Sequence, residues 1–138
     1  MRFKTCINYL LTVSQHEVFQ LLSDRLSSFG ITPGQYGVLD CLWENTQCSP
    51  KELSQELRLE NSTISGLLDR MQKKGLIDRV LDPNDRRSIQ VVLTPEGAAL
   101  ETEVLKVIED FNRQVLSQFD AKTAQTLLSC LMKIGGVE

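Results

Sequence analysis

The chain has 138 residues, 41% of them hydrophobic, which is the size of a single domain with its own core. Its formal charge is −3, no apolar run approaches the roughly 20 residues that span a bilayer, and signal-peptide features are missing, so we expect a cytoplasmic protein without membrane contact. Four cysteines without a C-x-x-C pair and a single histidine, His16, argue against a metal site, and we expect no other cofactor.

The first 30 residues are predicted to form a long amphipathic helix. Their apolar residues recur at helical spacing, and Phe29-Gly30 ends the segment. A second helix is expected from Thr32 or Pro33 to Glu44, because Thr32 is a suitable N-cap and proline fits the first helical position. This second helix would form the floor of the unit that follows.

A helix-turn-helix is predicted next. Ser49-Pro50-Lys51-Glu52 is a capping box, in which Ser49 and Glu52 each satisfy the other's backbone N–H, so a helix starts at Ser49. A turn of four residues leads to a second helix from about Asn61 to Lys74, which Gly75 ends. Its apolar stripe consists of Ile64, Leu67, Leu68 and Met71.

The opposite face of this second helix carries candidate DNA contacts. It has short polar residues near its start and basic residues near its end. Short side chains let a helix approach base edges in the major groove, and basic ones suit phosphates. The simpler reading is that serine and threonine only cap the helix. The candidates are Ser62, Thr63, Ser65, Arg70 and Lys73.

A two-stranded ribbon is predicted to follow the second helix. Residues 77–81 and 89–94 read as strands, and the charged stretch 82–88 between them reads as a seven-residue basic loop that presents Arg86 and Arg87. Between Ser62 and Gln90 six lysines and arginines face four aspartates, a net charge of +2 in an acidic chain. This combination indicates double-stranded DNA as the partner.

The rest of the chain is expected to be helical. Thr94-Pro95-Glu96 starts a helix, and Asp120 caps a last one. Helices at both ends are too long for one small domain to cover, so we expect a homodimer with two reading helices about 34 to 36 Å apart. The alternative is a monomer whose ends fold back. The prediction is one mainly α domain, residues 1–138, with a winged helix-turn-helix at about 31–97 and dimerisation helices at about 1–30 and 98–138.

Residues 82–97 resemble the signature of the MarR (multiple antibiotic resistance regulator) family. The family pattern is Asp-x-Arg, three residues, an aliphatic residue, one residue, Leu-Thr, two residues and Gly. It reads here, without a gap, as Asp85, Arg87, Val91, Leu93, Thr94 and Gly97. The similarity extends back to Ile31. It implies a winged-helix repressor that releases DNA when a small apolar or phenolic effector binds in a crevice, or when a cysteine is oxidised.

The resemblance also implies roles for single residues. Arg87 would insert into the minor groove, where a narrow A·T-rich stretch concentrates negative potential. Asp85 would support the wing by an ion pair to Arg87 or Arg70. Position 66 departs from the family, because it is Gly where many relatives carry a larger, often basic residue. Cys6 lies near the position of the reactive cysteine in organic-hydroperoxide sensors and is the candidate redox residue.

The leading hypothesis is therefore a dimeric transcriptional repressor of a pseudo-palindromic operator. One alternative is a winged-helix protein-interaction scaffold, and another is a redox-sensing repressor that uses Cys6. An enzyme is not expected, because the sequence has no nucleophile-base pair, carboxylate cluster or phosphate-binding glycine loop. Cys41 and Cys130 lie among leucines and are predicted to be core residues.

Overall fold

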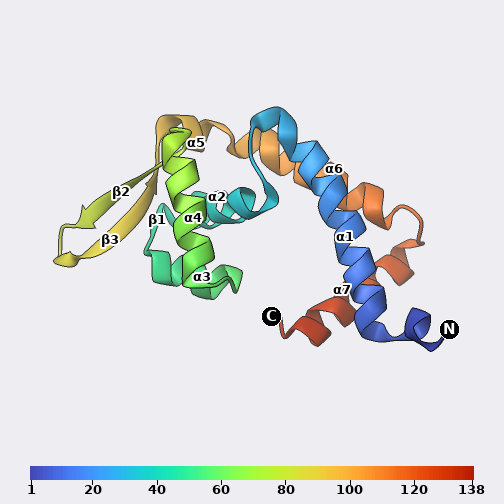
Figure 1. Cartoon of the computed structure of the whole chain (residues 1–138). Coiled ribbons are helices and arrows are strands. Elements are labelled where there is room, and N and C mark those ends of the chain that lie inside the picture. Colours follow the sequence, from blue (N-terminus) through green and yellow to red (C-terminus); the bar gives the residue numbers. More distant parts are fainter.

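The computed structural model describes residues 1–138, with the exception of the Arg86 side chain. Figure 1 shows a head built from α2, α3, α4 and a small sheet, connected to three long helices, α1, α6 and α7. The elements in chain order are η1 (Arg2–Thr5), α1 (Ile7–Leu26), η2 (Ser27–Phe29), α2 (Pro33–Asn45), β1 (Gln47–Cys48), α3 (Pro50–Leu57), α4 (Asn61–Lys73), β2 (Ile77–Asp82), β3 (Asp85–Leu93), α5 (Pro95–Ala99), α6 (Glu101–Leu116) and α7 (Ala121–Gly135).

Helix starts follow the local capping chemistry. Thr32 Oγ1 accepts the backbone N–H of Gln35 at 3.2 Å, and Ser49 Oγ accepts that of Glu52 at 3.1 Å, each within a complete capping box. Asp120 caps α7 in the same way through the N–H of Thr123, at 2.9 Å. The predicted starts of these three helices are confirmed, since each depends on residues at most three positions away.

The sheet differs from the prediction in two ways. Its order is β1-β3-β2, with every neighbouring pair antiparallel, and the short strand β1 was not predicted. The predicted seven-residue loop is wrong, because Asp82 pairs with Asp85 and only Pro83 and Asn84 lie between the strands. Arg86 and Arg87 therefore belong to β3 and not to the predicted loop.

The core lies inside the head, where α2, α3 and α4 pack against one another and against the sheet. The stripe predicted for α4 is confirmed, since none of its four side chains is more than 6% exposed. Gly75, which follows the C-cap Lys74 of α4, has a φ of +76°, a left-handed conformation that glycine adopts without strain.

The base of the hairpin is tied to the helix after it by several hydrogen bonds. Thr94 Oγ1 donates to Gly75 O at 2.6 Å and accepts the N–H of Gly97 at 3.1 Å. The indole Nε1 of Trp43 donates to Gly97 O at 3.1 Å. The backbone approaches so closely here that a Cβ on Gly97 would lie 2.1 Å from Leu76 O. This position therefore requires glycine.

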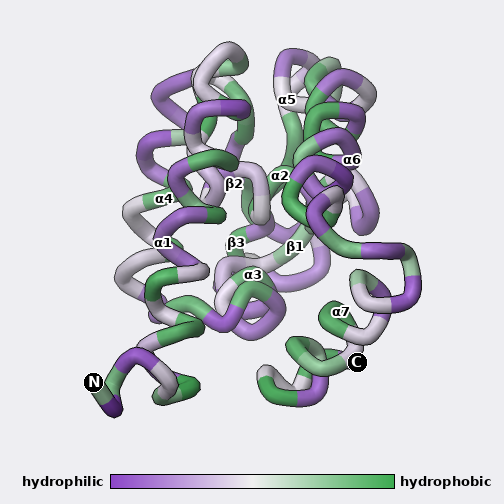
Figure 2. Tube along the Cα trace, turned by 90° about the vertical axis from the view of Figure 1, so that its right-hand side faces the viewer, coloured by the Kyte–Doolittle hydropathy of each residue, from purple (hydrophilic) through white to green (hydrophobic). Residues whose placement is uncertain are grey.

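The long helices pack loosely within the single chain. Helix α1 lies against α6, and α7 has no buried residue although it carries three leucines, a methionine and an isoleucine. Figure 2 shows hydrophobic residues along α7 and along the N-terminal part of α1. Among the described residues, no helix combines the length and apolarity needed to cross a membrane.

One contact joins the head to the far end of α7. Arg58, the left-handed C-cap of α3 with φ +54°, donates from Nη2 to Gly136 O at 2.7 Å and from Nη1 to Gly135 O. A cation at the carboxyl end of a helix is favourable, because the carbonyl oxygens there lack partners within the helix. Arg58 thus connects the head to the C-terminal end of α7.

Candidate nucleic-acid interface

The outward face of α4 is an uninterrupted polar surface. Ser62, Thr63, Ser65, Arg70 and Lys73 are all exposed, while the opposite side of the same helix is buried in the core. The structure thus brings the predicted residues together on one side of the head. No hydrogen bond from these five side chains to the rest of the described chain is present, so their donors and acceptors are open to a ligand.

Gly66 shapes the middle of this face. A Cβ at position 66 would lie 3.3 Å from Nη1 and 3.6 Å from Nη2 of Arg70, so the guanidinium of Arg70 lies over the space that a side chain would fill. Glycine at position 66, where the family pattern has a larger residue, therefore leaves room for the Arg70 side chain. It moves the positive charge of Arg70 toward the centre of the helix face.

The wing carries Arg87 on an exposed part of β3. Asp85 Oδ1 accepts the backbone N–H of Arg87 at 3.0 Å. Among the described side chains Asp85 makes no ion pair, so its support of the wing in this structure acts on the backbone of the hairpin and not on a guanidinium. The side chain of Arg86, also predicted to contact DNA, lies outside the described part of the chain.

Two basic residues near the interface are already engaged by the protein. Lys74 Nζ donates to Gln35 Oε1 at 3.0 Å and to Gly30 O, which ties the end of α4 to the start of α2. Arg79 in β2 forms an ion pair of 2.6 Å with Asp69 of α4. No local sequence pattern pointed to a role for Arg79, because its partners lie seven and ten residues away on a different element.

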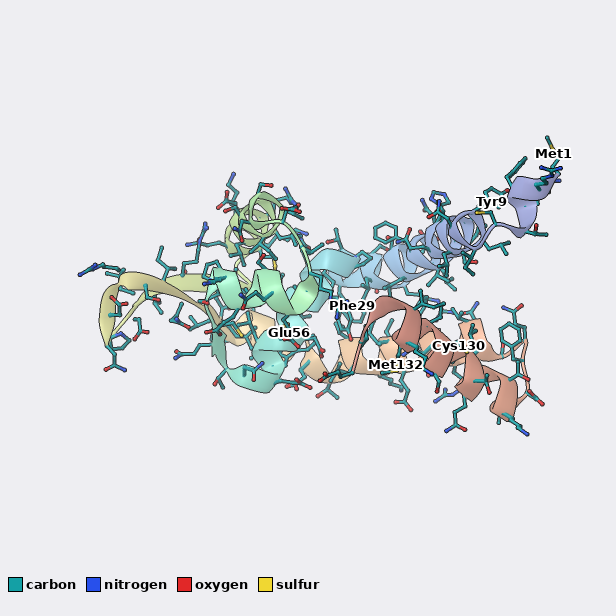
Figure 3. The ribbon with its side chains drawn as sticks, turned by 90° about the horizontal axis from the view of Figure 1, so that it is seen from below. Met1, Tyr9, Phe29, Glu56, Cys130 and Met132 are labelled. Carbon is teal, nitrogen blue, oxygen red and sulfur yellow. The ribbon has the colours of Figure 1, made fainter. Side chains whose placement is uncertain are left out.

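The cysteines are distributed over three surroundings. Cys6 and Cys130 are exposed, so the prediction that Cys130 is a core residue is wrong for the single chain, in which no residue of α7 is buried. Figure 3 shows Cys130 and Met132 on α7 and Tyr9 on α1. Cys48 is buried, and Cys41 packs against the core. The described residues contain no cluster that could hold a metal ion.

Burial makes Cys41 and Cys48 poor nucleophiles. Burial, then the neighbouring Cys48 and Glu56, raise the pKa of the Cys41 thiol to about 11. Burial and the carboxylates of Glu52 and Glu56 also raise the pKa of the Cys48 thiol. Because the thiolate is the reactive form, neither residue is suited to sense oxidants at neutral pH.

An apolar groove runs between α1, α6 and α7. Its volume is about 630 Å³, and its lining consists mostly of aliphatic and aromatic side chains with Glu17 as the only charged residue among them. The groove lies on the long helices and so is separate from the polar face of α4. The lining residues include Leu10, Val18, Phe111, Val115, Phe119 and Leu128.

Residues 31–89 match the model of the MarR family. The chain is 36% identical over 109 residues to the uncharacterized HTH-type transcriptional regulator YsmB of Bacillus subtilis, which covers 79% of this chain and 75% of that protein. It is 35% identical over 117 residues to the multiple antibiotic resistance protein MarR of Salmonella typhimurium, covering 83% of this chain and 81% of that protein.

The fold gives the same result. The crystal structure of a mutant of MarR from Escherichia coli in complex with operator DNA superposes with a TM-score of 0.87 at 27% identity, over 94% of each chain. The similarity therefore includes the head and the long helices. The chain belongs to the MarR family of winged-helix, DNA-binding transcriptional regulators.

Proposed function

We propose that this protein is a dimeric repressor that binds a pseudo-palindromic operator and is released by a small-molecule effector. The observation that carries the proposal is the open polar face of α4, with short side chains at one end and Arg70 and Lys73 at the other, beside a hairpin that presents Arg87. Both surfaces belong to one head and so can meet one duplex.

Each candidate residue is given a role by its place on this surface. Ser62, Thr63 and Ser65, at the N-terminal end of α4, would reach base edges in the major groove, where short side chains allow close approach. Arg70 and Lys73 would contact phosphates. Arg87 would enter the neighbouring minor groove, and Asp85 would support the backbone that carries it. Arg86 remains a candidate DNA contact.

Homodimer formation is supported by apolar surface that the single chain leaves exposed. Phe3, Ile7 and Phe19 near α1 are 46%, 61% and 43% exposed, and Leu131 and Ile134 on α7 are 42% and 61% exposed. Large apolar side chains exposed in such number on two neighbouring helices favour an interaction site in a globular protein. A second copy that covers both helices would bury it around a two-fold axis.

Effector binding would use the part of the groove between α1, α6 and α7 that the second copy leaves open. The volume of the whole groove, about 630 Å³, lies within the roughly 300 to 1,000 Å³ typical of ligand pockets. An apolar lining with few polar groups suits a small apolar or phenolic compound. Because α7 is bonded to the head through Arg58, an effector that displaced α7 would also change the position of the head.

The proposal is tested by selecting binding sites from a random duplex pool at physiological salt. Wild type is expected to enrich an inverted repeat, and Arg87→Ala should bind it more weakly by roughly 1 to 3 kcal/mol. Arg113→Ala is the matched control, because Arg113 is an exposed arginine on α6 paired only with Glu109 and Asp110. A plot of the logarithm of the affinity against the logarithm of the salt concentration should have a slope of about −0.9 for each contacted phosphate.

Failure of this experiment has a defined meaning. If no sequence is enriched and salt has little effect on binding, the head does not read DNA, and the protein-interaction scaffold becomes the better hypothesis. If the control variant loses as much affinity as Arg87→Ala, the loss comes from overall charge and the minor-groove role of the wing is wrong.

A second candidate route of release is oxidation of Cys6, whose thiol is exposed beside the first turn of α1. A hydroperoxide would oxidise the Cys6 thiolate to a sulfenic acid and be reduced to the alcohol. Peroxide should then weaken operator binding by wild type and by Cys130→Ser, but not by Cys6→Ser. Cys130 is the appropriate control, since it is the other exposed cysteine. Equal loss in all three proteins would exclude this route.

A further inference from the structure

One side chain connects the wing to the recognition helix α4. Arg79 in β2 donates from Nη2 to Asp69 Oδ1 at 2.6 Å and from Nε to Gln72 Oε1 at 2.8 Å. Asp69 and Gln72 are three residues apart and therefore lie on the same side of the helix, turned toward the hairpin. A single rigid guanidinium thus holds two points on α4 from one point on the strand.

Helix and strand are otherwise not packed at this level. A cleft of about 420 Å³ lies between them, and its lining consists of Asp69, Gln72, Lys73 and Arg79, with no apolar side chain among these residues. Apolar contacts therefore do not determine how far the hairpin stands from the helix here. The two bonds of Arg79 do.

The outer part of the hairpin has no support from the core. Ile77 and Val91 at its base are 1% and 0% exposed, whereas Leu81 and Ile89 farther out are 63% and 45% exposed. Figure 1 shows the tip extending away from the helices of the head. A two-stranded ribbon without support from other elements is only marginally stable in water. The hairpin alone therefore does not fix where its tip points. Within the described part of the chain, Arg79 is the outermost hairpin residue that bonds to α4.

The carboxylate of Asp69 stands where a negative charge is unfavourable for DNA binding. It is 59% exposed on the helix that carries the proposed phosphate contacts, and there it opposes a polyanion. The ion pair stabilises the fold little, because exposed pairs are screened by solvent. A residue that neither strengthens the core nor attracts DNA is best explained by its effect on geometry.

We propose that Arg79 is a positioning residue: its fork onto Asp69 and Gln72 fixes the angle between the wing and α4, so that Arg87 and the polar face of α4 reach the same duplex together. This inference rests on the proposed function of DNA reading. It assigns to Asp69 a favourable effect on DNA binding despite its charge, and it makes the contribution of Arg87 depend on Asp69.

The test is the affinity of the charge-neutralising variant Asp69→Asn for a duplex selected with wild type. Electrostatics alone require tighter binding when a negative charge facing DNA is removed. The positioning role requires weaker binding, by roughly tenfold, because the amide oxygen of the variant accepts only a weaker hydrogen bond from Arg79 and the ion pair is lost. Asp78→Asn is the matched control, since Asp78 is an exposed aspartate of the same strand without an ion-pair partner among the described side chains, and it should bind as tightly as wild type or more tightly.

A double-mutant cycle with Arg87→Ala then distinguishes positioning from a general weakening. Once the ion pair of the fork is lost, Arg87 engages the minor groove together with α4 less well, so Arg87→Ala should cost several-fold less affinity in the Asp69→Asn background than in wild type. The slope of log affinity against log salt concentration should also become less steep, by about 0.9 for each phosphate that the protein no longer neutralises. Thermal melts should be unchanged, because both partners are on the surface.

Three outcomes would overturn the proposal: tighter or unchanged binding by Asp69→Asn, additive losses in the cycle, or equal weakening by Asp78→Asn. Arg79→Lys provides a second variant that keeps the charge but not the fork, and it should lose affinity in the same direction as Asp69→Asn. If wild type itself shows no salt-dependent binding to any selected duplex, the proposed function fails, and that result is distinct from each of these three.

Discussion

Replacing Gly97 with alanine should destabilise the protein more than any other single added methyl group on its helices. The new Cβ would lie 2.1 Å from Leu76 O, 3.1 Å from Leu76 C and 3.1 Å from Leu93 Cδ2. Two of these three atoms are backbone, so a side-chain rotation cannot relieve the clash. Either α5 or the strand beside it must move by about an ångström, since unstrained carbon atoms pack roughly 3.5 to 4.0 Å apart.

The magnitude follows from what such a movement breaks. Three hydrogen bonds depend on this geometry: Thr94 N to Leu76 O at 3.1 Å, Gly97 N to Thr94 Oγ1 at 3.1 Å and Trp43 Nε1 to Gly97 O at 3.1 Å. Each contributes about 1 kcal/mol, and overpacking itself costs about 1 to 3 kcal/mol. If some of the bonds reform, the free energy of unfolding should fall by about 3 to 5 kcal/mol.

Urea unfolding followed by far-UV circular dichroism at fixed protein concentration measures this loss. Gly66→Ala is the control, because the added Cβ would meet only the mobile end of Arg70, at 3.3 Å, and alanine is favoured over glycine inside a helix by about 0.5 to 1 kcal/mol. That variant should be as stable as wild type or more stable. A loss below about 1 kcal/mol for Gly97→Ala would refute the reasoning, since it would show that α5 can shift without cost.

Three further outcomes are expected. Leu68→Ala should lower the free energy of unfolding by about 2 to 5 kcal/mol, because Leu68, on the buried side of α4, is 1% exposed and its truncation leaves a cavity. Denaturant titration measures this loss, and a value below about 1 kcal/mol would contradict the prediction. Cys41, the pKa of whose thiol is raised to about 11, should be alkylated far more slowly than Cys6 at about pH 8, with a rate that rises about tenfold per pH unit. Mass spectrometry of the labelled peptides measures both rates, and similar rates would contradict the raised pKa of Cys41. Hydrogen bonds from Thr123, first from its side chain, lower the pKa of Asp120, so its stabilisation of α7 is present above the ordinary pKa and is lost as pH falls through the lowered one; Asp120→Asn should remove this acid dependence from the melting temperature, and an unchanged acid profile would contradict the assignment.

Local chemistry was predictable from the sequence, and the structure explains why. The starts of α2, α3 and α7 depend on a side chain and a backbone N–H three residues apart, so Thr32, Ser49 and Asp120 suffice to locate them. The buried side of α4 followed from its period for the same reason. The polar side of that helix was predicted as the face opposite the apolar stripe. The structure places all five of its candidate residues at the surface.

Features that depend on distant partners were not predictable. Strand β1 has only two residues and exists because Val91 and Val92 of β3 pair with it. The charged ends of the hairpin read as a loop, because the pairing of Asp82 with Asp85 is set by the strands and not by hydrophobic alternation. The bonds of Arg79 escaped for a related reason. Nothing in the local pattern shows that a strand arginine reaches a carboxylate ten residues earlier on a helix.

Trp43 gives the molecule an internal optical probe. It is the only tryptophan in the chain, it bonds α2 to α5 through Gly97, and the ring of Tyr36 lies 6.4 Å from it between centroids. Its fluorescence therefore originates at the junction between the head and the C-terminal helices, with energy transfer from a neighbour in the same helix. A change in tryptophan emission when operator or effector is added would report movement at this junction, without a label or a second tryptophan to separate.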